Sequence, residues 1–275
     1  MQPHGWTGKG KVTNDAFQNA LDALGMDEPP RVWSFIVTIF GDLAQQAGDR
    51  LSGPVLGDIL SPVGVRPEAM RVALHRLRNE GWIETTKQGR VGLHGLTGFG
   101  LEQSSIASET IYASSNAACS DWHVLCFAHV ASVTEQVRAS TFTKQGYVAV
   151  SAGVYLANGP CVKIPSDALA LHGSLGDVPE WLPHSLVSSA QRTAFRALTH
   201  DLEQLGLDHS NVADFTPIQI ATLRAQIVHR WRKLVLKLPD VPDVLFGASF
   251  EGGQCRVEVL RTLDVLQRPA IASLI

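Results

Sequence analysis

Basic side chains recur along one segment of the sequence at helical spacing. Residues 66–82 read RPEAMRVALHRLRNEGW, in which Arg71, His75 and Arg78 share one helical face at i, i+4 and i+7, with Arg76 beside them. One arginine can donate two hydrogen bonds to a guanine edge, which is worth about 1–3 kcal/mol of discrimination between bases. The pattern therefore indicates a helix that reads DNA bases.

The same segment carries the features that a packed helix needs. Pro67 suits the first helical turn, and Gly81 suits the position just past the helix end. The apolar stripe that would face a core consists of Met70, Ala73, Leu74 and Leu77. Taken alone, an arginine-rich helix is more often a solvated surface than a DNA reader, so the flanking segments must decide.

The flanking segments predict two earlier helices and a later hairpin. Residues 32–46 carry an apolar stripe, and Ser52 can cap a short helix that runs to Leu60. Strands at 82–86 and 91–96 would flank a basic tip at 87–90. Three helices followed by a basic hairpin describe a winged helix-turn-helix, in which the third helix reads bases and the wing contacts phosphate. The candidate phosphate contacts are Arg66, Lys87 and Arg90.

Three stretches of the chain resemble one family of proteins. Residues 36–42 and 71–83 resemble the N-terminal domain of the PaaX-like transcriptional repressors, and residues 228–242 resemble their C-terminal domain. The resemblance implies a repressor of phenylacetic acid degradation or related aromatic catabolism. It implies a homodimer that binds double-stranded operator DNA and releases it when an aryl-CoA thioester, such as phenylacetyl-CoA, binds the C-terminal region.

An effector with several phosphates requires cations in its pocket. The densest cations outside the predicted DNA-binding domain are Arg230, Arg232, Lys233 and Lys237, which are our candidate effector contacts. The alternative is that these cations solvate the outer face of a long helix. Trp231 lies on the apolar stripe of that helix and is expected in the core.

The expected fold class is α+β with several domains. We expect an N-terminal extension with a short helix (1–30), a winged helix-turn-helix with a connecting helix (31–113), a ferredoxin-like middle domain (119–170) and a C-terminal helical effector or dimerisation domain (171–275). The resemblance implies that the middle domain is similar to the Cas2 nuclease fold. Its predicted first strand ends at 127–130 without a carboxylate, so we expect a spacer and dimerisation unit without metal.

Composition agrees with a folded regulator. The net charge is −3, yet residues 31–100 hold eight Arg and Lys against six Asp and Glu. Any contact with DNA therefore rests on where the cations lie. The four cysteines form no C-x-x-C pair, and no stretch of about 20 apolar residues could span a bilayer. With no signal-peptide pattern at the N-terminus, we expect a cytoplasmic protein without a cofactor.

Two other functional classes stay open at this point. The chain has no G-x-S-x-G elbow, phosphate-binding glycine loop or H-E-x-x-H motif, so we expect no enzyme, although scattered Asp and His residues could still converge in space. A winged-helix adaptor that binds proteins instead of DNA is the stronger rival. Salt-dependent binding to duplex DNA separates these interpretations.

Overall fold

The computed structural model describes residues 8–25, 31–118, 120–128, 132–161 and 163–274. The fold is α+β, and its described residues form two compact units. The first unit takes its described residues from 1–112, 197–233 and 257–275, and the second from 113–196 and 234–256. The predicted C-terminal segment thus contributes to both units, while the four-part division into domains stays a prediction.

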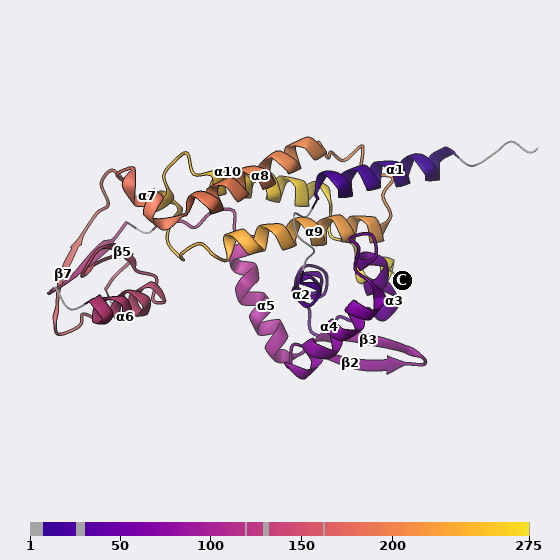
Figure 1. Ribbon diagram of the computed structural model, residues 1–275, viewed down its shortest axis with the longest axis horizontal. Helices are drawn as coiled ribbons and strands as arrows, with labels where there is room; N and C mark the ends of the chain where they lie inside the picture. The colour runs from indigo at the N-terminus through magenta and orange to yellow at the C-terminus, as the bar shows by residue number, and fades with distance from the viewer. Residues whose placement is uncertain (1–7, 26–30, 119, 129–131, 162, 275) are drawn as a thin grey trace, which may run out of the picture. The chain divides into compact units, whose positions relative to one another are not determined.

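The first unit contains helices around one core and a three-stranded sheet of order β1-β3-β2 (Figure 1). Its elements are α1 (Gly8–Ala23), α2 (Val32–Leu43), β1 (Leu51–Ser52), α3 (Gly53–Leu60), α4 (Pro67–Asn79), β2 (Ile83–Gln88), β3 (Val91–Leu96) and α5 (Gly98–Ile111). Three later helices also contribute to this unit: α9 (Pro217–Val235), most of α10 (Glu251–Val265) and the short η2 (Ile271–Leu274). The C-terminal part of α8 (Ser189–Leu205) belongs to it as well.

Local signals explain where these helices begin. The Ser52 hydroxyl accepts a hydrogen bond from the backbone N–H of Val55 at 3.3 Å and caps α3, as predicted. The Thr97 hydroxyl does the same for α5 through the N–H of Gly100 at 3.1 Å. Thr216 and Gln219 form a reciprocal capping box at the start of α9. These caps satisfy backbone N–H groups that have no partner inside the helix.

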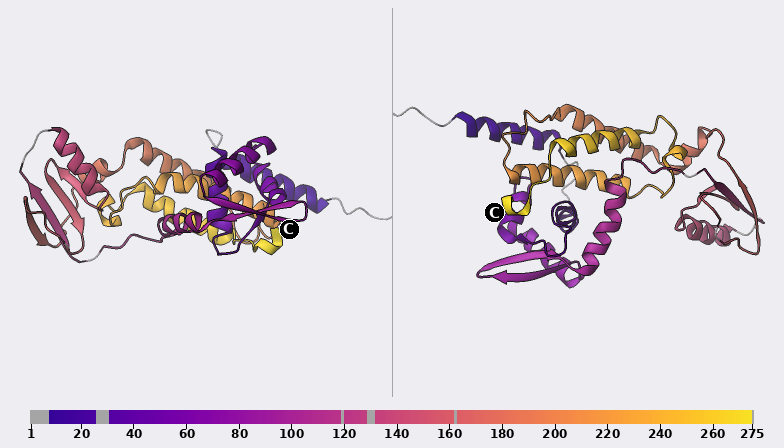
Figure 2. Two further views of the ribbon diagram at one scale, coloured as in Figure 1. Left: turned by 90° about the horizontal axis from the view of Figure 1, so that it is seen from below. Right: turned by 180° about the vertical axis from the view of Figure 1, so that it is seen from behind.

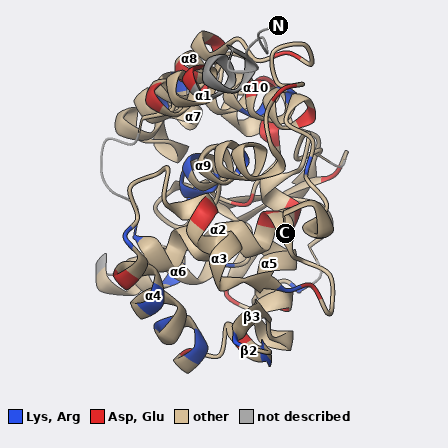
Figure 3. Ribbon diagram, turned by 90° about the vertical axis from the view of Figure 1, so that its right-hand side faces the viewer, with Lys and Arg blue, Asp and Glu red and all other residues tan. Residues whose placement is uncertain are grey.

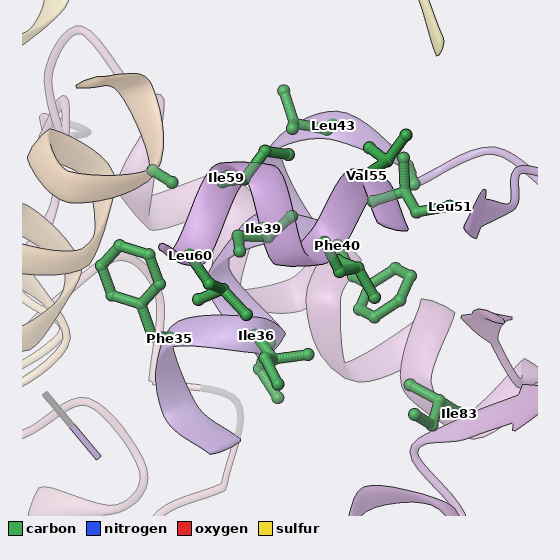
Figure 4. Close-up of a cluster of buried hydrophobic side chains, with 14 of the residues drawn as sticks. Phe35, Ile36, Ile39, Phe40, Leu43, Leu51, Val55, Ile59, Leu60 and Ile83 are labelled. Carbon is green, nitrogen blue, oxygen red and sulfur yellow. The ribbon is translucent and has the colours of Figure 1, made fainter. Parts of the chain in front are cut away.

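The core of the first unit is built around α2. Phe35, Ile36, Ile39 and Phe40 are fully buried on this helix, and Figure 4 shows them among side chains from α3 and the hairpin. Ala221 and Ala225 of α9 belong to the same cluster. Residues 221–229 of α9 are all buried, so the middle of this helix is enclosed on every side, whereas Lys233 near its C-terminal end is exposed.

The predicted helix of residues 13–24 is confirmed. It forms the larger part of α1, and Phe17, Leu21 and Leu24 are buried as expected. The predicted stop at residues 27–30 lies outside the described residues.

The second unit contains a four-stranded antiparallel sheet of order β5-β6-β4-β7. Its elements are β4 (Trp122–Phe127), α6 (Ser132–Thr143), β5 (Val148–Ser151), β6 (Val154–Asn158), β7 (Ala168–Gly173), α7 (Trp181–Leu186) and η1 (Asp243–Phe246). The N-terminal part of α8 and the first turns of α10 also belong to this unit. Glu135 of α6 accepts hydrogen bonds from the Gly153 N–H at 2.8 Å and the Tyr155 hydroxyl at 2.6 Å, which joins the helix to the sheet.

Two predictions for residues 161–205 were wrong. The sequence of 161–164 alone predicts a short strand, but Cys161, Lys163 and Ile164 lie in irregular backbone near two prolines. The fourth strand is β7 instead, and its Ala-Leu-Ala-Leu sequence favours a helix when read alone. The amphipathic pattern of residues 185–205 predicts one long helix, but the chain forms α7 and α8, because Val187 between them adopts an extended conformation.

Candidate nucleic-acid interface

Helix α4 carries the predicted base-reading residues on its exposed face. Ala73, Leu74 and Leu77 are buried, whereas Arg71, His75 and Arg78 are exposed. Figure 3 shows Lys and Arg recurring along α4 and near the hairpin. The structure therefore places the three candidates where a nucleic acid can reach them.

The ends of α4 are set by its flanking residues. Arg66 is the extended N-cap with φ −75° and ψ 149°, and Pro67 opens the helix, where a missing N–H is tolerated. Gly81 has φ 75°, a conformation that only glycine adopts readily, and it turns the chain into β2. The Trp82 N–H then bonds the Leu77 carbonyl at 2.9 Å. The hairpin consequently starts directly at the base of α4.

Two of the cations of α4 pair with exposed carboxylates of the same helix or its end. Arg71 pairs with Glu68 at 2.8 Å, and Arg76 pairs with Glu80 at 2.7 Å. Arg76 also lies over the Trp33 ring at 4.7 Å, which ties it to α2. Exposed pairs of this kind contribute about 0–1 kcal/mol, so phosphate can replace the carboxylates.

The hairpin projects from the base of α4 with its tip exposed (Figure 2). β2 and β3 pair from Ile83↔Leu96 to Gln88↔Val91, which leaves Gly89 and Arg90 as the turn. Lys87 and Arg90 are exposed, and among the described residues neither has an ion pair or hydrogen bond through its side chain. These two cations are thus available to phosphate, as is Arg66, which is exposed and likewise unpaired within the described chain.

The base of the hairpin is packed closely against its neighbours. A side chain at Gly100 would collide with the Trp82 carbonyl, and one at Gly95 would collide with Arg50. Arg50 forms an ion pair with Glu84 of β2 at 2.5 Å. These contacts fix the direction of the hairpin relative to α4.

His94 of β3 and Arg78 of α4 influence one another electrostatically. Burial and, second, the nearby Arg78 guanidinium lower the pKa of His94. Its Nδ1 lies 2.9 Å from the Thr85 hydroxyl on the opposite strand. His94 is therefore neutral at physiological pH and does not add to the positive charge of the interface.

A buried ion pair joins α2 to α9, and sequence reasoning did not find it. Arg224 donates from Nε and Nη2 to the two Asp42 carboxylate oxygens at 2.9 and 2.7 Å. The Tyr112 hydroxyl donates to Asp42 at 2.7 Å, and Arg268 lies 3.5 Å away. Burial, followed by Asp42, raises the pKa of Tyr112. The signal available in the sequence was one carboxylate at the end of the apolar segment 32–43.

A second buried polar group lies one turn earlier on α2. The Thr38 hydroxyl is 3.0 Å from Nδ1 of His229 and 3.0 Å from Nη1 of Arg232, and it donates to the Ser34 carbonyl at 3.1 Å. Burial lowers the pKa of His229 to about 3, and the charges of Arg232 and Lys233 add to this effect. His229 is therefore a neutral partner that fixes α9 against α2.

The candidate effector cations have different surroundings. Arg230 donates to Asp201 at 2.6 Å and to the Leu24 carbonyl at 3.2 Å, while Arg232 turns to α2. Lys233 and Lys237 are exposed, and Lys237 belongs to the second unit. Trp231 is fully buried, as expected, and donates to the Ile111 carbonyl at 2.8 Å. Arg230 and Arg232 thus do not share one cluster.

No metal site is found in the part of the chain that the structure describes. It contains no group of three or more His, Cys, Asp or Glu residues able to hold a metal ion. The end of the predicted first strand, at 129–130, lies outside the described residues, whereas His123 of β4 is buried and bonds the Gly159 carbonyl at 2.7 Å. None of the described helices is long and apolar enough to cross a membrane.

Comparison with known proteins finds family matches in the N-terminal and the C-terminal part of the chain. Residues 31–100 match the model of PaaX-like proteins, and residues 186–272 match that of the PaaX-like C-terminal domain. The chain is 24% identical over 277 aligned residues to transcriptional repressor PaaX of Escherichia coli K12, covering 94% of this chain and 85% of that protein. A solved uncharacterized protein of Mycobacterium tuberculosis is 17% identical with a TM-score of 0.46, covering 78% of this chain and 85% of that one. The chain belongs to the PaaX-like protein family.

Proposed function

We propose that this protein is a one-component transcriptional repressor that binds double-stranded operator DNA through α4 and the β2–β3 hairpin. The observation that carries the proposal is that Arg71, His75 and Arg78 are exposed on α4, and that the hairpin directly after α4 exposes Lys87 and Arg90, which have no ion pair among the described residues. Similarity to a transcriptional repressor over 94% of the chain supports it. In this proposal α2, α3, α4 and the hairpin act as a winged helix-turn-helix.

The contacts divide into two kinds. Arg71, His75 and Arg78 would meet base edges in the major groove, where bidentate arginine distinguishes guanine from the other bases. Arg66, Lys87 and Arg90 would meet phosphates, which position the protein without reading sequence. The two contributions can be measured separately because only phosphate contacts release counterions.

The exposed carboxylates that pair with arginines of α4 can be replaced by DNA phosphates. Glu68 and Glu80 hold Arg71 and Arg76 in the absence of DNA, and both carboxylates are themselves well exposed. A phosphate can take their place at little loss, because an exposed ion pair contributes at most about 1 kcal/mol. The freed carboxylates return to water.

The proposal includes a homodimer and an acyl-CoA effector. A two-fold dimer matches a palindromic operator. In the second unit the strand order β5-β6-β4-β7 supports a ferredoxin-like, Cas2-like sheet, although the described residues between β6 and β7 form no second helix. This sheet would serve dimerisation. The effector would be an aryl-CoA thioester such as phenylacetyl-CoA, with Arg230, Arg232, Lys233 and Lys237 as candidate contacts. The genes controlled would serve phenylacetate-type catabolism.

Release of DNA requires that the effector favour the form that does not bind DNA. Each tenfold preference for that form corresponds to roughly 1.4 kcal/mol. The exposed Lys233 and Lys237 are the effector candidates that remain accessible, and Arg230 would first have to leave Asp201.

Fluorescence anisotropy tests the proposal. The full-length protein is titrated onto labelled DNA from upstream of its own gene at several salt concentrations, then with phenylacetyl-CoA and with free CoA. We expect sub-micromolar, sequence-selective binding that falls with salt and is reversed by phenylacetyl-CoA alone. Selective DNA binding that phenylacetyl-CoA does not change would contradict the proposed effector and keep the repressor. Binding no tighter than to random DNA would favour the winged-helix adaptor.

A further inference from the structure

A small cavity of about 60 Å³ lies between α2, α5 and α9 within the first unit. Figure 1 shows these three helices side by side. Most of its lining is apolar, and Val37, Ile111 and Val228 come from the three different helices. Of the polar side chains that also line it, Ser104 has no hydrogen-bond partner through its hydroxyl, and Arg232 has no carboxylate partner among the described residues.

Arg232 is a largely buried cation without a counter-ion. Its Nη1 donates to the Thr38 hydroxyl at 3.0 Å and lies 3.5 Å from the Ser34 carbonyl, which are both neutral. Among the described residues no Asp or Glu pairs with Arg232, and none supplies an acceptor for its Nε and Nη2, which are not fully buried. Burial lowers the pKa of Arg232, and the nearby Tyr112 acts in the opposite direction. An open Nε–Nη2 edge matches the two oxygens of a carboxylate.

The other charged groups near the cavity do not neutralise Arg232. Asp42 reaches the cavity only through the Tyr112 hydroxyl, and it is already paired with Arg224 and Arg268. His229 is neutral because burial lowers its pKa to about 3. Arg232 is thus the one charged side chain among the described residues that line the cavity, and a bound anion would be attracted to it.

Ser104 supplies a second unused donor. Its hydroxyl oxygen is buried and has no hydrogen-bond partner among the described residues. A buried polar group without a partner is destabilising by about 1–3 kcal/mol, and native structures contain few of them. A ligand that accepts from Ser104 would remove this loss.

We propose that this cavity binds a short-chain organic carboxylate. The carboxylate oxygens would bond the Nε–Nη2 edge of Arg232, with Ser104 as a further donor, and the alkyl chain would pack on Val37, Ile111 and Val228. Benzene occupies a cavity of about 150 Å³, so this smaller one suits acids of about two to four carbons and excludes an aryl ring. The site shares Arg232 with the acyl-CoA contacts proposed above, but the nucleotide part of a CoA thioester cannot enter a cavity of this volume.

The position of the cavity connects it with α4. Trp82, which follows α4 and begins the hairpin, also lines the cavity. Its ring lies 5.4 Å from that of Phe99 on α5 in an edge-to-face contact. An acid in the cavity would touch the segment that directs α4 and the hairpin, and so a small metabolite could stabilise one arrangement of the DNA-binding face.

Binding is tested on the full-length protein without DNA, so failure here is distinct from failure of the DNA-binding proposal. Propionate is titrated and followed by saturation-transfer NMR and calorimetry in a chloride buffer, with propionamide as the uncharged analogue of equal size. We expect saturable binding of propionate that is at least tenfold tighter than that of propionamide. Equal binding of the two compounds would overturn the proposal.

Two variants and one control locate the site. Arg232→Gln should weaken propionate at least tenfold, while Lys163→Gln removes an exposed charge of the second unit that does not line the cavity and should change affinity less than twofold. Gly41→Ala adds a methyl group to the cavity wall, where the nearest atom is the Ser104 hydroxyl at 3.9 Å, and it should weaken propionate severalfold without harming the fold. Unchanged affinity in Gly41→Ala, or equal losses in Arg232→Gln and Lys163→Gln, would contradict the assignment. Tighter binding of phenylacetate or inorganic phosphate than of propionate would overturn the ligand class.

Discussion

Arginine occurs on both α4 and α9, but the surroundings of the side chain differ between the two helices. On α4, Arg71 and Arg76 are exposed and paired with carboxylates at i−3 and i+4. On α9, Arg224 is buried against Asp42, 182 residues away in the chain. The first kind of pair can be exchanged for DNA phosphate, whereas the second holds two helices together. The role of a charged residue on a helix therefore cannot be assigned until the burial of its side chain is known.

The largest expected effect follows from removal of Asp42. Asp42→Ala leaves Arg224 buried without a carboxylate, which should lower the free energy of unfolding by about 3–5 kcal/mol. Urea denaturation measures the loss. The matched control is Glu68→Ala, which removes the exposed partner of Arg71 and should change stability by less than about 1 kcal/mol. Similar losses in the two variants would remove the distinction between the helices.

Removal of one base-reading cation should reduce sequence discrimination in DNA binding and leave the fold unchanged. Arg78→Ala should reduce discrimination between the operator and sequences altered at one base pair by about 1–3 kcal/mol. Because Arg78 is exposed and has no ion-pair partner among the described residues, the urea midpoint should stay the same. Anisotropy with a panel of single-base variants measures the effect. A uniform loss on every sequence would assign Arg78 to phosphate instead.

The neutral His229 on α9 predicts a dependence of stability on pH. Its folded-state pKa of about 3 lies below the unfolded value of 6.5, so only the unfolded chain binds a proton between them. Stability is complete above pH 6.5 and falls as the pH decreases, at roughly 1 kcal/mol per pH unit from this group below pH 6. Urea titrations at pH 7, 6 and 5 test this.

The control for this pH effect is His229→Gln, which keeps a polar contact to Thr38 and does not titrate. The variant should have a flatter pH profile than the wild type over the same range. Parallel profiles would show that other groups cause the acid sensitivity.

The smallest expected effect belongs to the hairpin tip. Lys87→Ala should weaken binding to operator and random DNA equally and reduce the slope of log affinity against log salt by about 1. Lys163→Ala, an exposed lysine of the second unit, is the control and should leave the slope unchanged. An effect of Lys87→Ala on sequence preference would show that the wing reads bases.

The sequence predicted those parts whose signals are local. The residues Ser52, Pro67 and Gly81 placed the ends of α3 and α4 to within about two residues, and the two predicted strands of the hairpin matched β2 and β3 equally well. The exposed face of α4 followed from its helical period. These signals require no knowledge of which segments meet.

Features that depend on distant contacts escaped prediction. Nothing near Asp42 or Arg224 reveals that they pair, and a solvated outer face was an equally reasonable interpretation of the α9 cations. Strand β7 has helix-favouring residues and forms a strand because β4 offers a free edge, with Leu171 opposite Val124. In each case tertiary structure overrides local preference.

The most direct test of the central claim compares binding of the wild type and of a triple variant, Arg71→Ala, His75→Ala and Arg78→Ala, to upstream DNA and to the same DNA shuffled. All three side chains are exposed, so the variant should fold normally by circular dichroism. The account predicts that the wild type prefers the upstream sequence by at least a hundredfold and that the variant binds both sequences equally and weakly. Equal binding of the two sequences by the wild type, or a preference that persists in the variant, would contradict the assignment of α4 as the DNA-reading helix.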